Sequence, residues 1–265
     1  ALVTSRSGTL LAFAEGRHSL NDDGDIDIVL RRSVDMGATW SDLAVAVDMG
    51  SDTVGNPTPI VMAGSDRIWL PFCSNPGTDA NTRSVWLTYS DDDGKTWVTP
   101  RDITAQAKPA DWTWYATGPG RGIETTQGRL VIPADHVDGF GVRRSHVVFS
   151  DDAGETWTVG GSAAPDTDEA QVVELSDGRL MLNMRYEGDV RARAIAISSD
   201  AGATWGETTF DNQLPDPGCE GSILAIPQGL LFSNPATTVA FPRDHVTVRW
   251  SQDNGATWAF SRLLD

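Results

Sequence analysis

Residues 150–157 read Ser-Asp-Asp-Ala-Gly-Glu-Thr-Trp, and close copies of this octet begin at residues 33, 90, 198 and 251. All five copies fit the pattern Ser-x-Asp-x-Gly-x-Thr-Trp, and successive copies begin 48 to 60 residues apart. The pattern predicts a tight turn, in which the Asp carboxylate accepts hydrogen bonds from nearby backbone N–H groups and the Gly takes a conformation that a Cβ would resist. We expect the Thr-Trp pair to re-enter a strand, and we assign the octets no catalytic role.

Short β-rich runs precede every octet, for example residues 26–30 and 85–89, and each follows an earlier run, such as residues 8–13 or 178–182. Short strands with frequent turn signals and no helical periodicity predict an all-β protein. A repeat of about 50 residues that contains several strands is typical of a β-propeller blade. No linker divides the chain, so we predict one domain over residues 1–265.

The composition restricts the partners. The 265 residues carry a formal net charge of −17 with a sequence pI of about 4.4, which disfavours nucleic acid and anionic membranes. No stretch approaches the roughly 18 apolar residues of a membrane span. An acidic substrate would need a local cluster of Arg to overcome the overall charge.

Metal and cofactor chemistry has no signature in the sequence. The two cysteines allow at most one disulfide, and the four histidines are scattered without CxxC or HExxH spacing. We therefore expect no metal and no cofactor. The chain opens with Ala-Leu-Val-Thr, which reads like the middle of a strand, so a leader upstream is compatible with it. Localisation stays open, with a secreted or periplasmic protein favoured.

The octet resembles the Asp-box, or BNR, repeat of sialidases (neuraminidases), a repeat that also occurs in sortilin-like receptors, other glycosidases and non-catalytic propellers. The residues between the octets resemble sialidases in the family's order. Residues 9–17 look like the stretch that follows the Phe/Tyr-Arg-Ile-Pro motif, and residues 22–33 like the loop and strand of the acid/base aspartate. Residues 168–185 are the most specific match, to the segment with the catalytic glutamate and the second arginine of the triad; residues 232–235 and 243–249 resemble the strand of the third arginine.

The resemblance implies a six-bladed β-propeller, incomplete at both ends, with the activity of a bacterial-type retaining exo-α-sialidase. Sialic acid carries a carboxylate on its anomeric carbon, and Arg gives bidentate recognition of such a group. The matched positions are Arg185 and Arg243. A neutral tyrosine avoids the repulsion that a carboxylate nucleophile would meet, and sialidases are known for this exception. The tyrosine needs a base, and the resemblance assigns that role to Glu169, with Asp168 one position away.

The resemblance also assigns Asp22 as the general acid and later the base for water, because it lies five residues after Arg17 as in the family. Asp23 and Asp25 share the same polar turn. Arg17 is expected near the carboxylate or the 4-hydroxyl of the sugar, and Asn56 is expected to bind the 4-hydroxyl, although Asn-Pro is also a common turn. Residues 112–120 resemble a loop near the site, and we leave the role of their aromatic side chains open.

Two family features are absent, namely the first triad arginine in the Phe/Tyr-Arg-Ile-Pro motif and the nucleophilic tyrosine beyond the last octet. We therefore expect the sequence to be a fragment of a longer gene product and to be inactive by itself. Three alternatives stay open: a trans-sialidase, a non-catalytic Asp-box propeller that binds glycan or protein, and a hydrolase for another ulosonic acid. The expected partner is a sialylated glycan, and the oligomeric state is open.

Overall fold

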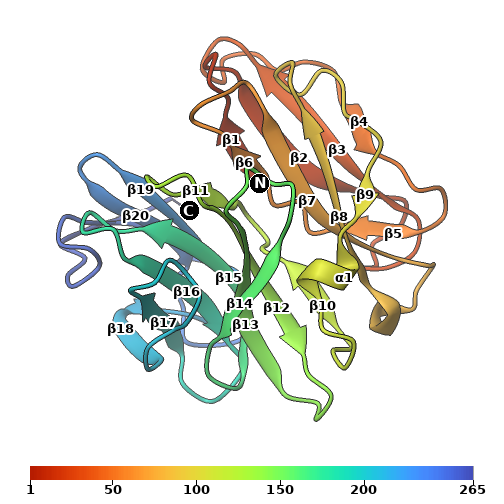
Figure 1. Cartoon of the computed structure of the whole chain (residues 1–265). Coiled ribbons are helices and arrows are strands. Elements are labelled where there is room, and N and C mark those ends of the chain that lie inside the picture. The colour runs from red at the N-terminus through yellow and green to blue at the C-terminus, as the bar shows by residue number, and fades with distance from the viewer. Residues whose placement is uncertain (265) are drawn as a thin grey trace.

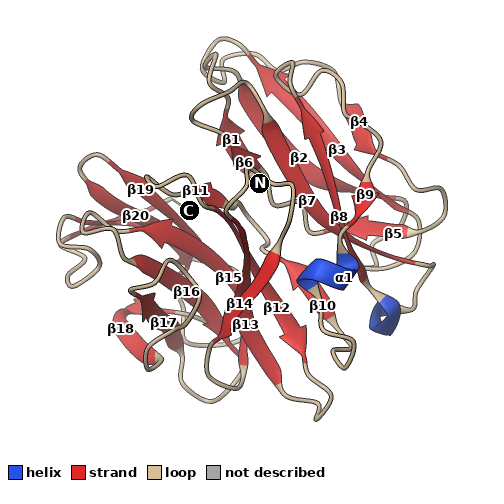
Figure 2. Cartoon of the chain, in the orientation of Figure 1, coloured by secondary structure: helices blue, strands red, loops and turns tan. Residues whose placement is uncertain are grey.

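The computed structural model describes residues 1–264, and its regular secondary structure consists almost entirely of strands joined by turns and loops, as Figures 1 and 2 show. Within residues 1–264, helical structure is limited to a 3-10 turn at Ala80–Thr82 and the four-residue α1 at Thr104–Ala107. The prediction of an all-β protein is confirmed. No helix in the described part of the chain is long and apolar enough to cross a membrane.

The strands form five antiparallel units that follow one another along the chain. The first unit contains β1 (Leu2–Thr4), β2 (Leu10–Arg17), β3 (Ile26–Ser33) and β4 (Ala44–Val47). The second contains β5 (Thr53–Gly55), β6 (Ile60–Val61), β7 (Ile68–Asn75), β8 (Ser84–Ser90) and β9 (Arg101–Asp102). The third contains β10 (Tyr115–Thr117), β11 (Ile123–Glu124), β12 (Leu130–Val137), β13 (Arg143–Ser150) and β14 (Thr158–Ser162). The fourth contains β15 (Thr167–Glu174), β16 (Leu180–Tyr186), β17 (Ala192–Ser198) and β18 (Thr209–Pro215), and the fifth β19 (Ser222–Ile226), β20 (Gly229–Pro235), β21 (Val246–Ser251) and β22 (Phe260–Leu263).

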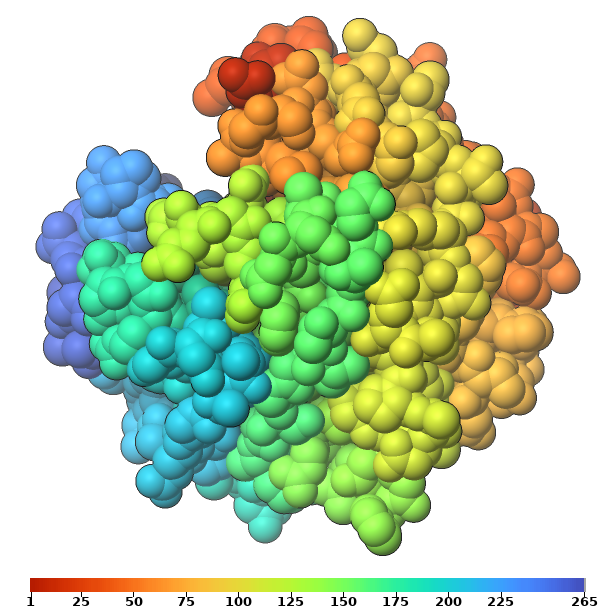
Figure 3. Space-filling model, viewed as in Figure 1, coloured from red at the N-terminus to blue at the C-terminus, as the bar shows by residue number. Residues whose placement is uncertain are grey.

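The units are joined into four sheets, because a parallel contact between β3 and β5 merges the first two into one nine-stranded sheet. The sheets do not close into a ring over residues 1–264, and in Figure 3 a notch separates the red and orange first units from the blue fifth unit. The six-bladed propeller therefore stays a prediction.

The hydrophobic core is divided among the spaces between neighbouring units. Leu11 and Phe13 of the first unit pack with Leu70 and Phe72 of the second, and all four side chains are buried. Similar clusters fill the spaces between the second and third, third and fourth, and fourth and fifth units. Each unit is thus stabilised mainly by its neighbours, as expected for a repeat protein.

The octets form the turns between the last two strands of each unit, with the predicted hydrogen bonds. In the fourth copy the backbone N–H of Thr204 donates to Asp200 Oδ1 at 2.8 Å, and that of Gly202 donates to Ser198 Oγ at 2.8 Å. The side-chain hydroxyl and backbone N–H of Thr204 lower the pKa of Asp200 to about 2. The glycines of the five octets have φ between +73° and +95°, a backbone conformation that residues with a Cβ rarely adopt.

The Thr-Trp pair does not re-enter a strand, so that part of the prediction is wrong. β4 begins at Ala44, after Trp40, and β18 begins at Thr209, after Trp205. The physical reason is that the Thr side chain and N–H are both held by the Asp carboxylate, which keeps the pair in the turn.

Candidate active site

The predicted site residues line a cavity of about 1000 Å³. Its walls come from the ends of strands in the first four units and from loops of the first, second and fifth units. The six predicted residues all line this cavity: Arg17, Asp22, Asn56, Glu169, Arg185 and Arg243. Five arginines line it, which concentrates at one place the fixed positive charges that an acidic ligand requires, but seven carboxylates line it as well.

Asp168 and Glu169 both reach the cavity because the register of β15 against β16 shifts between Thr167 and Ala170. Successive side chains of a regular strand point to opposite faces, and a bulge can re-aim one of them. Asp168 is 6% exposed and accepts from Arg143 at 2.9 Å, whereas Glu169 is more accessible and accepts from Arg185 at 2.8 Å. Of the adjacent pair, Glu169 is therefore the carboxylate available to a ligand.

Arg185 lies among three carboxylates. Its Nη1 pairs with Glu169, its Nη2 pairs with Glu187, and its Nε lies 3.7 Å from Asp168 Oδ2. Burial opposes the positive charge, but hydrogen bonding and attraction from these carboxylates outweigh it and raise the pKa of the guanidinium. Arg185 thus stays charged and is held in one orientation.

Asp22 lies in the loop between β2 and β3, and its side chain is 89% exposed. Arg17 at the end of β2 pairs with Asp22 through Nη1 and with Glu15 through Nη2 at 2.6 Å. A carboxylate on an exposed loop that is tethered to one arginine is able to approach and leave a bound group.

Asn56 occupies a left-handed backbone conformation with φ of +58°, which Asn tolerates better than most residues. Its backbone N–H donates to Glu15 Oε1 at 3.0 Å, and its carbonyl accepts from Thr117 Oγ1 at 2.6 Å. The residue is therefore fixed at the wall of the cavity.

Arg243 lies in the loop between β20 and β21 and is exposed. Its Nη2 donates to the carbonyl of Gly218 at 3.3 Å. Among residues 1–264 it has no carboxylate partner, unlike Arg17 and Arg185, which leaves its charge available to an external anion.

Comparisons with known proteins agree on one family. A family model described as the BNR repeat-like domain matches residues 8–265. A sialidase of Bacteroides fragilis is 34% identical over 291 residues, which cover 97% of this chain and 53% of the relative. An exo-alpha-sialidase of Arthroderma benhamiae is 33% identical, with 100% of this chain and 69% of the relative covered. The solved structure of a Hadza microbial sialidase is similar with a TM-score of 0.93 and 36% identity, covering 100% of this chain and 58% of that one.

The chain belongs to the bacterial-type sialidase superfamily. It spans about half the length of the Bacteroides relative.

The three tyrosines of this sialidase-family chain lie away from the cavity. Tyr115 is fully buried and contacts His146 at 3.3 Å, Tyr89 packs against Trp69, and Tyr186 packs against Phe210. Burial raises the pKa of Tyr115 well above its usual range. None of the three lines the cavity.

The cavity of the sialidase-family chain also contains charged residues that sequence reasoning missed. Asp135 on β12 is fully buried, accepts from Trp114 Nε1 at 2.8 Å and pairs with Arg143 at 3.2 Å. Burial, and then the charge of Asp168, raise the pKa of Asp135 well above its usual range. Only Trp114 lay in a stretch that the sequence singled out; Asp135 and Arg143 lie in ordinary strand runs.

Glu220 was also missed. It lies just before β19 and lines the cavity with Glu169. Burial, and then the charge of Glu169, raise the pKa of Glu220 to about 7, against the opposing effect of Arg193.

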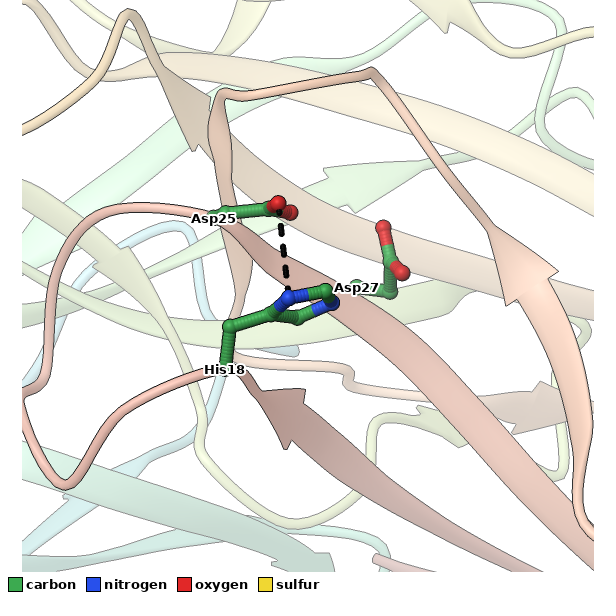
Figure 4. A group of neighbouring side chains, drawn as sticks. All are labelled: His18, Asp25 and Asp27. Atoms are coloured by element: carbon green, nitrogen blue, oxygen red, sulfur yellow. Dashed lines mark ion pairs between the residues drawn. The ribbon is translucent and has the colours of Figure 1, made fainter.

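Three side chains of a kind that can bind a cation lie close together at the base of the loop that carries Asp22. One ligand atom each from His18, Asp25 and Asp27 lies within 4.8 Å of the others, as Figure 4 shows. His18 Nδ1 and Asp25 Oδ2 are 3.6 Å apart, and both side chains are exposed. Water can satisfy such exposed groups, so we assign the group no step in the chemistry.

Proposed function

We propose that this chain provides most of the active site of a retaining exo-α-sialidase that hydrolyses terminal sialic acid from glycoconjugates. The observation that carries the proposal is the presence of Asp22, Glu169, Arg185 and Arg243 around one cavity. The names of the relatives point to the same activity. The five units would be five blades of a six-bladed propeller.

In this proposal Arg185 and Arg243 bind the carboxylate of the sugar through charge-assisted hydrogen bonds. Asp22 gives its proton to the glycosidic oxygen as the bond to the leaving sugar breaks. A tyrosine from outside residues 1–265 attacks the anomeric carbon, and Glu169 accepts its proton. Asp22 then takes a proton from the water that displaces the tyrosine, Glu169 returns its proton to the leaving tyrosine oxygen, and the sugar leaves with its original configuration.

Three other functions remain alternatives, and one of them, a hydrolase for another ulosonic acid, would keep the arginines of the cavity. A trans-sialidase would use the same residues and pass the sugar to an acceptor hydroxyl instead of water. A binding propeller would need the arginines but not the exposed acid Asp22 or the base Glu169, so the combined presence of both acids favours an enzyme.

The direct test is hydrolysis of an aryl sialoside reporter by the chain carrying its natural flanking sequence. Glu169→Gln should lower kcat by about 10²- to 10⁴-fold, the usual contribution of general base catalysis. Glu174→Gln is the matched control, because Glu174 on the same strand binds Thr126 outside the cavity and should not affect the rate. Residues 1–265 alone should turn over poorly or not at all. Wild-type rates for Glu169→Gln would contradict the assignment, and binding of the reporter without turnover would favour the binding propeller.

A further inference from the structure

The hydrogen bonds around Asn56 begin at an arginine that neither the sequence pattern nor the proposed reaction uses. Arg83 lies between the 3-10 turn and β8 and is 6% exposed. Its Nη1 donates to Asn56 Oδ1 at 3.0 Å, and its Nε donates to Asn75 Oδ1 at 3.1 Å. The guanidinium carbon lies 4.2 Å from the centre of the Trp114 ring, which holds it by a cation–π contact.

The direction of these hydrogen bonds is determined by chemistry. A guanidinium carries only donors, so each Asn must present its oxygen to Arg83 and its NH₂ group elsewhere. Asn75 follows this rule, because its Nδ2 donates to the carbonyl of Gly77 at 3.0 Å. Asn56 is oriented in the same way, with Oδ1 on Arg83.

The NH₂ group of Asn56 is then left for the cavity. The backbone of Asn56 is held on both sides, through Glu15 at its N–H and through Thr117 and Thr58 at its carbonyl. Within residues 1–264, Asn56 Nδ2 donates to no partner, and the residue lines the cavity. A donor fixed at a cavity wall selects for a ligand atom that accepts.

We propose that Arg83 is a specificity-determining positioning residue, which turns Asn56 so that its amide NH₂, a donor, meets an oxygen of the substrate. The inference rests on the proposed function, and the oxygen that we expect there, from the resemblance of Asn56 to a family position, is the 4-oxygen of sialic acid. An oxygen that only has to accept needs no hydrogen of its own. The hydrogen bond from Asn56 is therefore kept in a sialoside with a 4-O-methyl group, whereas a carboxylate at the same place would require the 4-hydroxyl hydrogen.

The test compares two aryl sialosides, the 4-hydroxy parent and its 4-O-methyl derivative, with the chain carrying its natural flanking sequence. The measured quantity is the ratio of their kcat/KM values, methyl over parent, so that the steric effect of the methyl group is common to all variants. Asn56→Asp should lower this ratio by about tenfold, because the new carboxylate offers no donor to the ether oxygen. Asp also tolerates the left-handed conformation, so this variant should fold.

Two substitutions of Arg83 separate positioning from a purely structural role. Arg83→Met frees the amide of Asn56 to turn and should give a ratio between those of the wild type and Asn56→Asp. Arg83→Lys keeps a side chain that only donates and should restore the wild-type ratio, even if the protein is less stable because the stacking on Trp114 is weakened.

The outcomes are distinguishable. An unchanged ratio in Asn56→Asp or Arg83→Met, with turnover of the parent sialoside intact, overturns the role of Arg83 and leaves the proposed function in place. A lowered ratio in Arg83→Lys equal to that of Arg83→Met also overturns it. No turnover of the parent sialoside by the wild type would instead contradict the proposed function.

Discussion

At the scale of single residues, the cavity depends on how acids are shared among a few arginines. Arg185 engages Glu169 and Glu187, and Arg143 engages Asp135 and Asp168. Such pairs are costly to bury, and breaking one leaves an unpaired charge. Asp135 and Asp168 are the buried carboxylates of these pairs, whereas Glu169, Asp22 and Arg243 are more accessible.

The raised pKa of Glu220 leads to a prediction of how the stability of the protein depends on pH. Its pKa is raised to about 7 in the folded protein, against an unfolded value near 4.5. The folded state then binds more protons than the unfolded state between those values, so this residue lowers stability as pH rises from about 4.5 to 7. Glu220→Gln should stabilise the protein above pH 7, by at most about 3 kcal/mol, and have little effect near pH 4.

Urea denaturation at pH 4.5 and pH 8 measures this difference. Glu207→Gln, on an exposed loop, is the control and should change stability equally at the two pH values. A stability gain for Glu220→Gln that is the same at both pH values would count against the shifted titration of Glu220.

Six cavity residues were predictable from the sequence because each lies in a segment whose order matches a family. Arg83, Asp135 and Glu220 were not predictable in this way. They are charged residues in ordinary strand ends and loops, and only the packing of the second, third and fifth units brings them to the cavity. The β-bulge at Asp168 and Glu169 was also invisible, because it depends on pairing with β16.

At the scale of elements, the repeated turns explain why the strands were easy to predict. The runs 26–30 and 178–182 fall within β3 and around the start of β16, and the octet between each pair of strands carries its own hydrogen bonds. The error over the Thr-Trp pair has the same origin. The pattern shows which residues form the turn. It does not show that the Asp carboxylate accepts hydrogen bonds from both the N–H and the hydroxyl of Thr, which keeps the Thr-Trp pair in the turn and delays the start of the next strand.

The first serine of an octet allows a test of how much the turn contributes to stability. Ser198 is buried, donates to Asp200 Oδ1 at 2.7 Å and accepts from the N–H of Gly202. Ser198→Ala should lower the free energy of unfolding by about 1–3 kcal/mol, because buried polar groups lose their partner. Ser199→Ala changes an exposed neighbour and should be close to neutral. Equal stabilities of the two variants in urea denaturation would argue against the turn as a source of stability.

At the scale of the whole molecule, the octets also pack against the neighbouring unit. A Cβ added at Gly154 in the third unit would lie 2.7 Å from the Trp69 ring of the second, and one at Gly202 would lie 2.9 Å from Val147 of the third unit. The absence of a side chain at these turns allows neighbouring units to approach closely.

Gly154→Ala tests this contact. It should destabilise the protein by about 2–4 kcal/mol, from overpacking against Trp69 together with an unfavourable positive φ. Gly128→Ala has a similar φ of +86° but no atom within 4 Å of the added Cβ, so it should cost about 1 kcal/mol. Thermal unfolding of both variants gives the packing contribution as their difference, and equal costs would show that the units do not depend on this contact.

The most direct test of the account is a crystal structure of the chain with its natural flanking sequence and bound sialic acid. The measurement is the distance from the sugar carboxylate oxygens to the guanidinium nitrogens of Arg185 and Arg243. We predict about 2.8 Å to both arginines, with Asp22 and Glu169 on the two sides of the anomeric carbon. A sugar bound outside the cavity, or a carboxylate that contacts neither arginine, would contradict the account.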